Sequence, residues 1–111
     1  MGQITDEELF DLYNDTIEKC GIYLLKEEDE TIEYNIFEEF DIGVHTFLYI
    51  DNLKKLYHKK LISLDKLCKS IMLREKFIDL QDSDEWSVEK FKTSKNWKEI
   101  MMLSDEIKNM G

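Results

Sequence analysis

The sequence predicts an all-α fold, a compact bundle of five to six helices, and three observations lead to this. The 111-residue chain has no proline and only four glycines, which argues against long irregular loops and against a sheet built on tight glycine turns. Hydrophobic residues make up 42% of the chain and can fill a core although 36% of the residues are charged. The length suits one core, so we expect residues 1–111 to form a single helical domain.

The first helix is predicted to begin after Thr5. Thr5 and Glu8 have the spacing of a capping box, in which each side chain accepts a hydrogen bond from a backbone amide of the other's turn. Apolar residues then recur at intervals of three and four, as on one face of a helix. These residues are Leu9, Leu12, Tyr13, Ile17 and Cys20. We expect Gly21 to end the helix in a left-handed turn.

Residues 22–41 allow two interpretations. The apolar run 22–25 fits either a strand or the start of a helix, and residues 31–36 alternate as a strand would, so a small hairpin near residues 22–36 remains open. We favour a helix over residues 29–40, because Ile32, Ile36 and Phe40 follow four-residue spacing and no glycine marks a turn.

Two helices are predicted at the centre of the bundle. Residues 44–57 are apolar nearly all the way round, which is typical of a helix covered on every side. Ser63 is a suitable N-cap for a second helix over residues 63–80. Its main apolar stripe comprises Leu64, Leu67, Cys68, Ile71 and Ile78, and a second stripe comprises Leu73, Phe77 and Leu80.

The C-terminal part is predicted to form two more helices after the polar residues 81–85. Trp86, Val88 and Phe91 suit one short helix, and Thr93 or Ser94 caps the last one. The last helix has a regular inward stripe of Trp97, Ile100, Met101, Ser104 and Ile107. Both tryptophans are interpreted as core or lid residues, because no basic cluster interleaves with them to suggest nucleic-acid stacking.

The charges are distributed unevenly along the chain. Residues 1–41 carry 14 acidic and 2 basic side chains, residues 42–78 carry 3 and 8, and residues 79–111 carry 8 and 5. A nucleic-acid groove needs the opposite sign over most of the surface, so we expect no direct binding of DNA or RNA. The first residues lack a basic start and an apolar run, and apolar runs are short throughout, so we expect a cytoplasmic protein without membrane contact. Cys20 and Cys68 are both expected to be reduced thiols in the core.

Motifs for catalysis or cofactor binding are missing from the sequence. It has no phosphate loop, dinucleotide fingerprint, His-Glu-x-x-His or Cys-x-x-Cys. Two pairs, Asp41 with His45 and Asp51 with His58, have spacings that suit a metal or general-base site, but neither has a third ligand at helical spacing. We therefore expect a protein that is not an enzyme and needs no metal or cofactor.

The acidic segment 27–41 is the strongest candidate for a functional surface. It contains eight carboxylates around four large apolar side chains and one tyrosine. On a helix, Glu30, Tyr34, Glu38 and Asp41 fall on the side opposite Ile32 and Ile36. The candidate partner-binding residues are Glu27, Glu28, Glu30, Tyr34, Glu38 and Asp41. The alternative is a solvated acidic face that only keeps the protein monomeric.

Residues 38–80 contain two segments of note, Asp-Ile-Gly-Val-His-Thr-Phe-Leu at 41–48 and Lys-Lys-Leu-Ile-Ser-Leu-Asp-Lys-Leu at 59–67. The chain as a whole, and mainly residues 38–80 with these segments, resembles the small acidic helical immunity proteins of bacterial toxin systems, including contact-dependent growth inhibition. This resemblance implies a cytosolic antidote, a monomer that forms a 1:1 complex with one cognate toxin domain, commonly a basic nuclease. The acidic segment independently predicts a positively charged protein partner.

Two other functions remain open at this point. An acidic nucleic-acid mimic, such as a phage anti-defence inhibitor, would occupy a DNA-binding enzyme. A small regulatory helical protein could carry the same acidity incidentally. The gene next to this one separates the three cases, because an immunity protein is expected directly downstream of a toxin and a mimic is expected in a phage operon.

Overall fold

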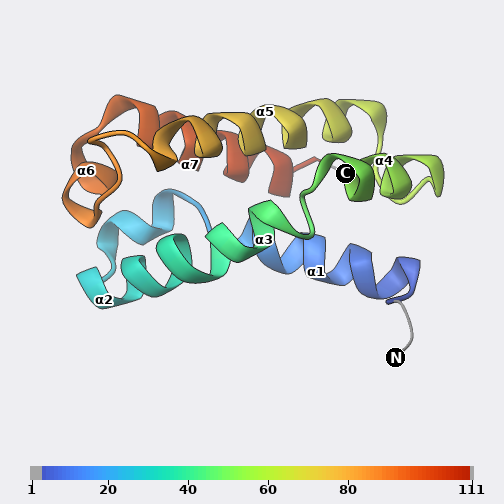
Figure 1. Ribbon diagram of the computed structural model, residues 1–111, viewed down its shortest axis with the longest axis horizontal. Helices are drawn as coiled ribbons and strands as arrows, with labels where there is room; N and C mark the ends of the chain where they lie inside the picture. The colour runs from blue at the N-terminus through green and yellow to red at the C-terminus, as the bar shows by residue number, and fades with distance from the viewer. Residues whose placement is uncertain (1–3, 111) are drawn as a thin grey trace.

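The computed structural model describes residues 4–110, and these residues are helical with no strand among them, which confirms the predicted all-α class. Figure 1 shows the arrangement of the helices. The elements in chain order are α1 (Asp6–Glu18), the 3₁₀ helix η1 (Ile22–Lys26), α2 (Asp29–Ile32), the π-helical η2 (Glu33–Phe40), α3 (Asp41–His45), α4 (Ile50–His58), α5 (Leu64–Gln81), α6 (Val88–Thr93) and α7 (Lys95–Lys108).

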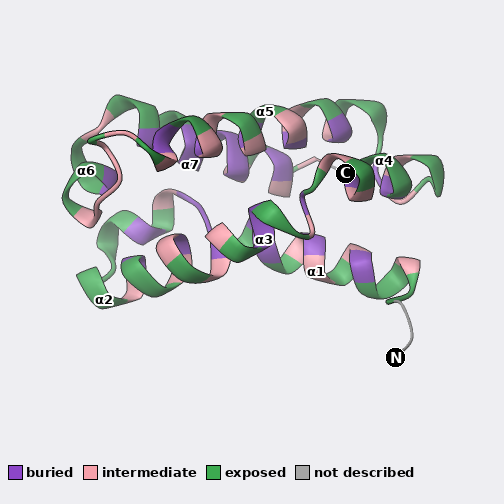
Figure 2. Cartoon of the chain, in the orientation of Figure 1, coloured by how far each residue is buried: buried purple, intermediate pink, exposed green. Residues whose placement is uncertain are grey.

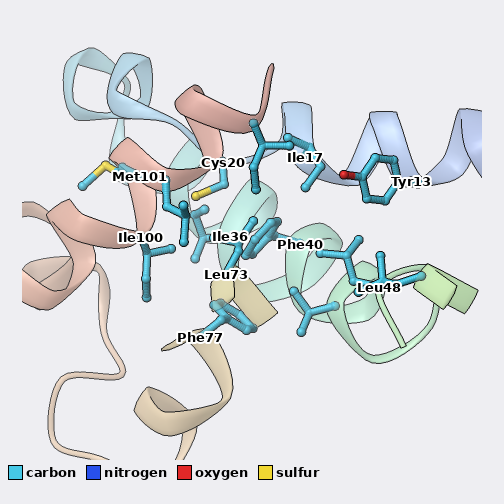
Figure 3. Packing of buried hydrophobic residues seen from close by; sticks show 14 of the residues in the cluster. Tyr13, Ile17, Cys20, Ile36, Phe40, Leu48, Leu73, Phe77, Ile100 and Met101 are labelled. Carbon is cyan, nitrogen blue, oxygen red and sulfur yellow. The ribbon is translucent and has the colours of Figure 1, made fainter. Parts of the chain in front are cut away.

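The helices form two layers. The first layer contains α1 and the unbroken rod made by α2, η2 and α3, and the second contains α5, α6 and α7, with α4 at one end (Figure 1). Counted with α2, η2 and α3 as one helix, the described residues hold six helices besides the 3₁₀ turn, as predicted. Buried residues line the space between the layers (Figure 2), where side chains from both meet in one core (Figure 3).

Helix α1 begins as the sequence predicts and ends differently. The capping box is present, with Thr5 N donating to Glu8 Oε1 at 2.8 Å and Glu8 N donating to Thr5 Oγ1 at 3.0 Å. The left-handed turn at Gly21 was a wrong prediction, because its backbone is extended, with φ 168° and ψ 169°. A Cβ at Gly21 would lie 2.5 Å from Asp105 Oδ1 and 2.7 Å from Lys108 Nζ. The glycine therefore leaves room for the ends of the Asp105 and Lys108 side chains, which hydrogen-bond to Ile22 N and to the carbonyl of Cys20.

Residues 22–40 adopt the helical interpretation. Residues 22–26 form η1, and the hairpin alternative is wrong for this described part of the chain. The predicted helix begins at Asp29, and it continues beyond Phe40 to His45. Ile32, Ile36 and Phe40 are fully buried, as their four-residue spacing predicted.

The predicted central helix over residues 44–57 is wrong. The chain leaves helical geometry at Thr46, with φ −120° and ψ −75°, and α4 begins only at Ile50. The side chain of Asn52 stabilises the break by donating to the carbonyl of Thr46 at 2.7 Å. The apolar residues of segment 44–57 would cover every side of one continuous helix, because this segment is the end of α3, a turn and most of α4, and each part buries a different side. The core is instead built around α5 and α7, which pack side by side (Figure 1).

Helix α5 has its predicted N-cap, since Ser63 accepts a hydrogen bond from Lys66 N, but the predicted second stripe is the more deeply buried one, while Ile71 and Ile78 of the main stripe are only partly buried. The buried residues are Leu67, Ser70, Leu73, Phe77 and Leu80. Leu64 and Cys68 of the predicted main stripe are exposed, so of the two thiols only that of Cys20 lies in the core. Ser70 hides the true stripe in the sequence: its hydroxyl is buried 2.6 Å from the hydroxyl of Tyr13.

The C-terminal helices follow the prediction closely. Ser94 caps α7, and the whole predicted stripe of that helix is buried. Trp97 donates its indole N–H to the carbonyl of Glu85 at 2.6 Å, which satisfies its only polar atom in the core. Four aromatic rings surround it within 6 Å between centroids, namely those of Phe37, Phe77, Trp86 and Phe91.

Candidate functional site

The fold separates charge between its two layers. Residues 4–45, which contain α1, η1 and the α2–η2–α3 rod, carry 14 acidic side chains and two lysines, whereas residues 46–110, which contain α4 and the second layer, carry 11 acidic and 13 basic side chains. The charge gradient along the sequence thus becomes a difference between two sides of the molecule. A positive partner would be drawn towards the layer of α1 and the α2–η2–α3 rod.

Five of the six predicted partner-binding residues lie on this layer and point to solvent. Glu27, Glu28 and Glu30 are exposed where the chain enters α2, and Tyr34 and Glu38 are exposed on η2. The Tyr34 side chain is 51% exposed, as the helical interpretation predicted. Together with Glu33, also exposed, these residues form a surface that we call the acidic face, comprising Glu27, Glu28, Glu30, Glu33, Tyr34 and Glu38.

Asp41, the sixth predicted residue, belongs to a different contact. Gln81 Nε2 of α5 donates to Asp41 Oδ1 at 2.5 Å, and His45 Nε2 lies 3.4 Å from the same oxygen and 3.0 Å from Gln81 Oε1. Asp41 shares its side of the rod with Phe37, which packs on Trp86 and Trp97 of the second layer. Its predicted outward position is therefore wrong, and its carboxylate ties α3 to the end of α5.

Ion pairs within the described residues leave the acidic face unneutralised. Of the first layer's carboxylates, Asp29 pairs with Lys92, and Asp6 lies 3.9 Å from Lys55 and 3.8 Å from Lys59. Within residues 4–110, no lysine or arginine nitrogen lies within 4.0 Å of a carboxylate of the acidic face. The negative charge of this surface is therefore presented to solvent.

Tyr34 is held in place by the wide turn of η2. Its hydroxyl donates to Glu39 Oε1, five residues on, at 3.2 Å. This hydrogen bond and the charge of Glu39 raise the pKa of Tyr34 above its ordinary value. A tyrosine hydroxyl of ordinary pKa is already protonated near neutral pH, so the exposed ring is an uncharged aromatic group in the middle of carboxylates.

A groove runs between α1 and the α2–η2–α3 rod, and the sequence prediction missed it. We call it the α1–η2 groove; its cavity volume is about 350 Å³. Its lining residues are Leu12, Asp15, Thr16, Glu18, Lys19, Tyr23, Asn35, Glu39, Ile42 and Phe47. One signal was present in the sequence: Asn35, Glu39 and Ile42 recur at three- and four-residue spacing on a side of the helix that is neither core nor the predicted outer side.

The bottom of the groove is set by a close crossing of two helices. A Cβ added to Gly43 of α3 would lie 2.9 Å from Thr16 Cβ of α1, and closer still to Thr16 Cγ2 and Oγ1. Thr16 turns its hydroxyl back to the carbonyl of Leu12 at 2.8 Å, so its polar group is satisfied inside the contact. Residue 43 therefore has to be a glycine for α1 and α3 to approach this closely.

The described residues contain no cluster that resembles a metal site. No three His, Cys, Asp or Glu side chains within residues 4–110 come together as ligands would. The structure brings Asp41 to His45, but the third group there is the amide of Gln81. Asp51 and His58 are both exposed on α4. Within residues 4–110, none of the helices combines the length and apolar character needed to cross a membrane.

Comparison of the chain with protein-family models, with curated proteins and with solved structures found no significant match. The function is therefore argued from the two surface features of the first layer, the acidic face and the α1–η2 groove.

Proposed function

We propose that this protein is a bacterial immunity protein, a cytoplasmic antidote that binds a basic toxin domain, in particular a nuclease, in a 1:1 complex and blocks it without catalysis. The observation that supports this proposal most is the acidic face, in which five exposed carboxylates surround the exposed ring of Tyr34 on a layer of strongly negative charge. Nucleases bind polyanions through positive surfaces, and such a surface is complementary to this one.

The geometry suits the two stages of inhibitor binding. Surface charge acts over roughly a Debye length, about 8 Å at physiological ionic strength, and raises the rate of encounter with an opposite charge. An exposed aromatic side chain can then be buried at the interface, where tyrosine is among the residues that most often contribute a large share of the binding energy. The hydrogen bond from Tyr34 to Glu39 favours one orientation of the ring, which lowers the side-chain entropy lost when the ring is buried.

The direct test uses the gene upstream of this one. If that gene encodes a toxin whose C-terminal domain stops growth of a bacterial host, coexpression of this protein should restore growth, and the purified proteins should form a 1:1 complex. The variant Glu30→Lys with Glu38→Lys should protect less well. A matched control is Glu75→Lys with Glu89→Lys, which changes the net charge equally at two exposed positions of the second layer.

Two results would contradict the proposal. The first is a protein that leaves its neighbour's activity unchanged at a tenfold molar excess. The second is a protein that inhibits unrelated DNA-binding enzymes as well as it inhibits its neighbour, because that breadth is the behaviour of a nucleic-acid mimic.

A further inference from the structure

We propose that the α1–η2 groove is a docking site for an extended segment of a basic protein partner. The segment places a lysine or arginine side chain among Asp15, Glu18 and Glu39 and rests an apolar side chain on Ile42 and Phe47. This inference rests on the proposed function only in taking the partner to be basic. It adds a second binding site, beside the acidic face, with its own chemistry.

The negative half of the groove has the composition that receives a cation. Three carboxylates line it, one at each of Asp15, Glu18 and Glu39, against the single lysine Lys19. The cavity of about 350 Å³ lies in the range of sites that enclose a ligand group, so a long side chain fits inside. A cation in this half of the groove is attracted by carboxylates of both α1 and η2. This attraction is stronger than that of a single surface ion pair.

The wall between these carboxylates is ordered by hydrogen bonds. The hydroxyl of Tyr23 donates to the carbonyl of Glu18 at 2.7 Å, and Asn35 Nδ2 approaches the same hydroxyl at 3.4 Å. These bonds join the end of α1 to η1 and η2, so the groove is preformed. Tyr23 remains 45% exposed, and its ring offers an apolar surface to the methylene stem of a lysine or arginine.

The other half of the groove is apolar and continues past its end. Ile42 is 57% exposed although it is a large aliphatic residue, and Phe47 lines both this groove and a second hollow of about 430 Å³. The second hollow is also lined by the exposed side chains of Ile4 and Tyr49. Exposed apolar side chains gathered beside a charged site are characteristic of a protein interface.

The arrangement of the two halves favours a peptide segment over a small molecule. The groove that holds the three carboxylates and the hollow lined by Ile4 and Tyr49 share Phe47 as a lining residue, so the two adjoin at that side chain. Successive side chains of one extended chain can meet these positions in turn. The expected sequence is a lysine or arginine followed within a few residues by an aliphatic or aromatic side chain.

A displayed library of random nine-residue peptides tests the inference with the full chain as bait. We expect enrichment of peptides that combine a cationic with an apolar residue. A synthetic copy of the most enriched peptide should shift the amide NMR signals of Thr16, Ile42 and the Asn35 side chain.

Two substitutions and two matched controls then locate the binding. Ile42→Gln and Glu39→Lys should each lower the affinity for the synthetic peptide at least tenfold. Met102→Gln removes an apolar side chain of similar exposure (55%) on α7, and Glu75→Lys makes the same charge change at an exposed position of α5, outside both the groove and the acidic face. Both controls should bind within about threefold of the parent, and circular dichroism melts confirm that all four variants fold.

Failure of the inference can be told apart from failure of the proposed function. No enrichment, enriched peptides without a cation, or equal weakening of peptide binding by Glu75→Lys and Glu39→Lys would overturn the groove as a docking site. If Ile42→Gln and Glu39→Lys neutralise the neighbouring toxin as well as the parent, the function stands and the groove inference falls. If the peptide binds in the groove but no neighbouring toxin is neutralised, the groove stands and the immunity function falls.

Discussion

Replacing Gly43 by alanine tests whether α1 and α3 cross as closely as the structure places them. The new Cβ would lie 2.9 Å from Thr16 Cβ and closer to the other two side-chain atoms, whereas carbon atoms pack best at about 3.5 to 4.0 Å. Overpacking of this kind costs about 1 to 3 kcal/mol. Alanine is favoured over glycine inside a helix by about 1 kcal/mol, which offsets part of that cost.

Because three atoms of a buried side chain are too close at once, we take the upper half of the overpacking range. Gly43→Ala should therefore destabilise the protein by about 1 to 2 kcal/mol in urea unfolding followed by circular dichroism, with an unchanged m-value. Thr16→Ala removes the two closest atoms, Oγ1 and Cγ2, and leaves only the Cβ contact. In that background the penalty of Gly43→Ala should shrink by about 0.5 kcal/mol or more, which is the coupling expected of touching residues.

The reasoning would be refuted by a gain of about 1 kcal/mol on Gly43→Ala in the parent background, because that is the response of an unobstructed helical glycine. Equal penalties with and without Thr16→Ala would also contradict the crossing. If folded Gly43→Ala also loses affinity for the peptide, the close contact between α1 and α3 determines the shape of the α1–η2 groove, because this contact forms the bottom of the groove.

Three further predictions concern the core and the acidic face. Leu73→Ala should destabilise the protein by about 2 to 5 kcal/mol, as truncation of a buried leucine does, whereas Cys68→Ala on the exposed side of α5 should change stability by less than about 0.5 kcal/mol. Equal values in denaturant melts would mean that α5 turns a different side to the core than the structure shows. Burial raises the pKa of the Cys20 thiol to about 12 from 9.0, so the unfolded chain loses this proton at a lower pH than the folded protein, and the free energy of unfolding should fall above pH 9 by up to about 1.4 kcal/mol per pH unit. Melts of Cys20→Ala between pH 8 and 10 should show a shallower fall than the parent, and an identical slope would exclude this thiol as the cause. Tyr34→Ala should change the free energy of unfolding by no more than about 0.5 kcal/mol and should weaken partner binding by on the order of 2 kcal/mol, mainly through faster dissociation measured by surface plasmon resonance. A variant that fails to fold would instead indicate that Tyr34 belongs to the core.

Local signals in the sequence were sufficient for three helix starts and for the inward stripe predicted on α7. Thr5, Ser63 and Ser94 cap helices as predicted, because a capping bond involves only residues two or three apart. Every residue of the predicted α7 stripe is buried, because all its members except Ser104 are apolar and follow one period, whereas the buried Leu103 was not predicted.

The errors arise where a distant residue decides the local outcome. Ser70 is buried because Tyr13, 57 positions away, supplies its hydrogen-bond partner, and a polar residue at this position kept the most buried side of α5 from being predicted as its main stripe. Asp41 is turned from the acidic face by Gln81 on α5. The α1–η2 groove depends on Thr16 and Gly43, which come together only when α1 meets α3. No pattern within one helix contains that information.

The association rate of this protein with its toxin partner, measured by stopped-flow fluorescence as a function of salt, tests most directly whether the acidic face steers binding. The account predicts a parent rate that approaches about 10⁸ M⁻¹s⁻¹ at low salt and falls steeply as salt is added. Glu30→Lys with Glu38→Lys should lower the low-salt rate at least tenfold and flatten the salt dependence, while Glu75→Lys with Glu89→Lys keeps most of both. Equal rates and equal salt slopes for the two double variants would contradict the account, because the acidic face would then be no more than a solvated surface.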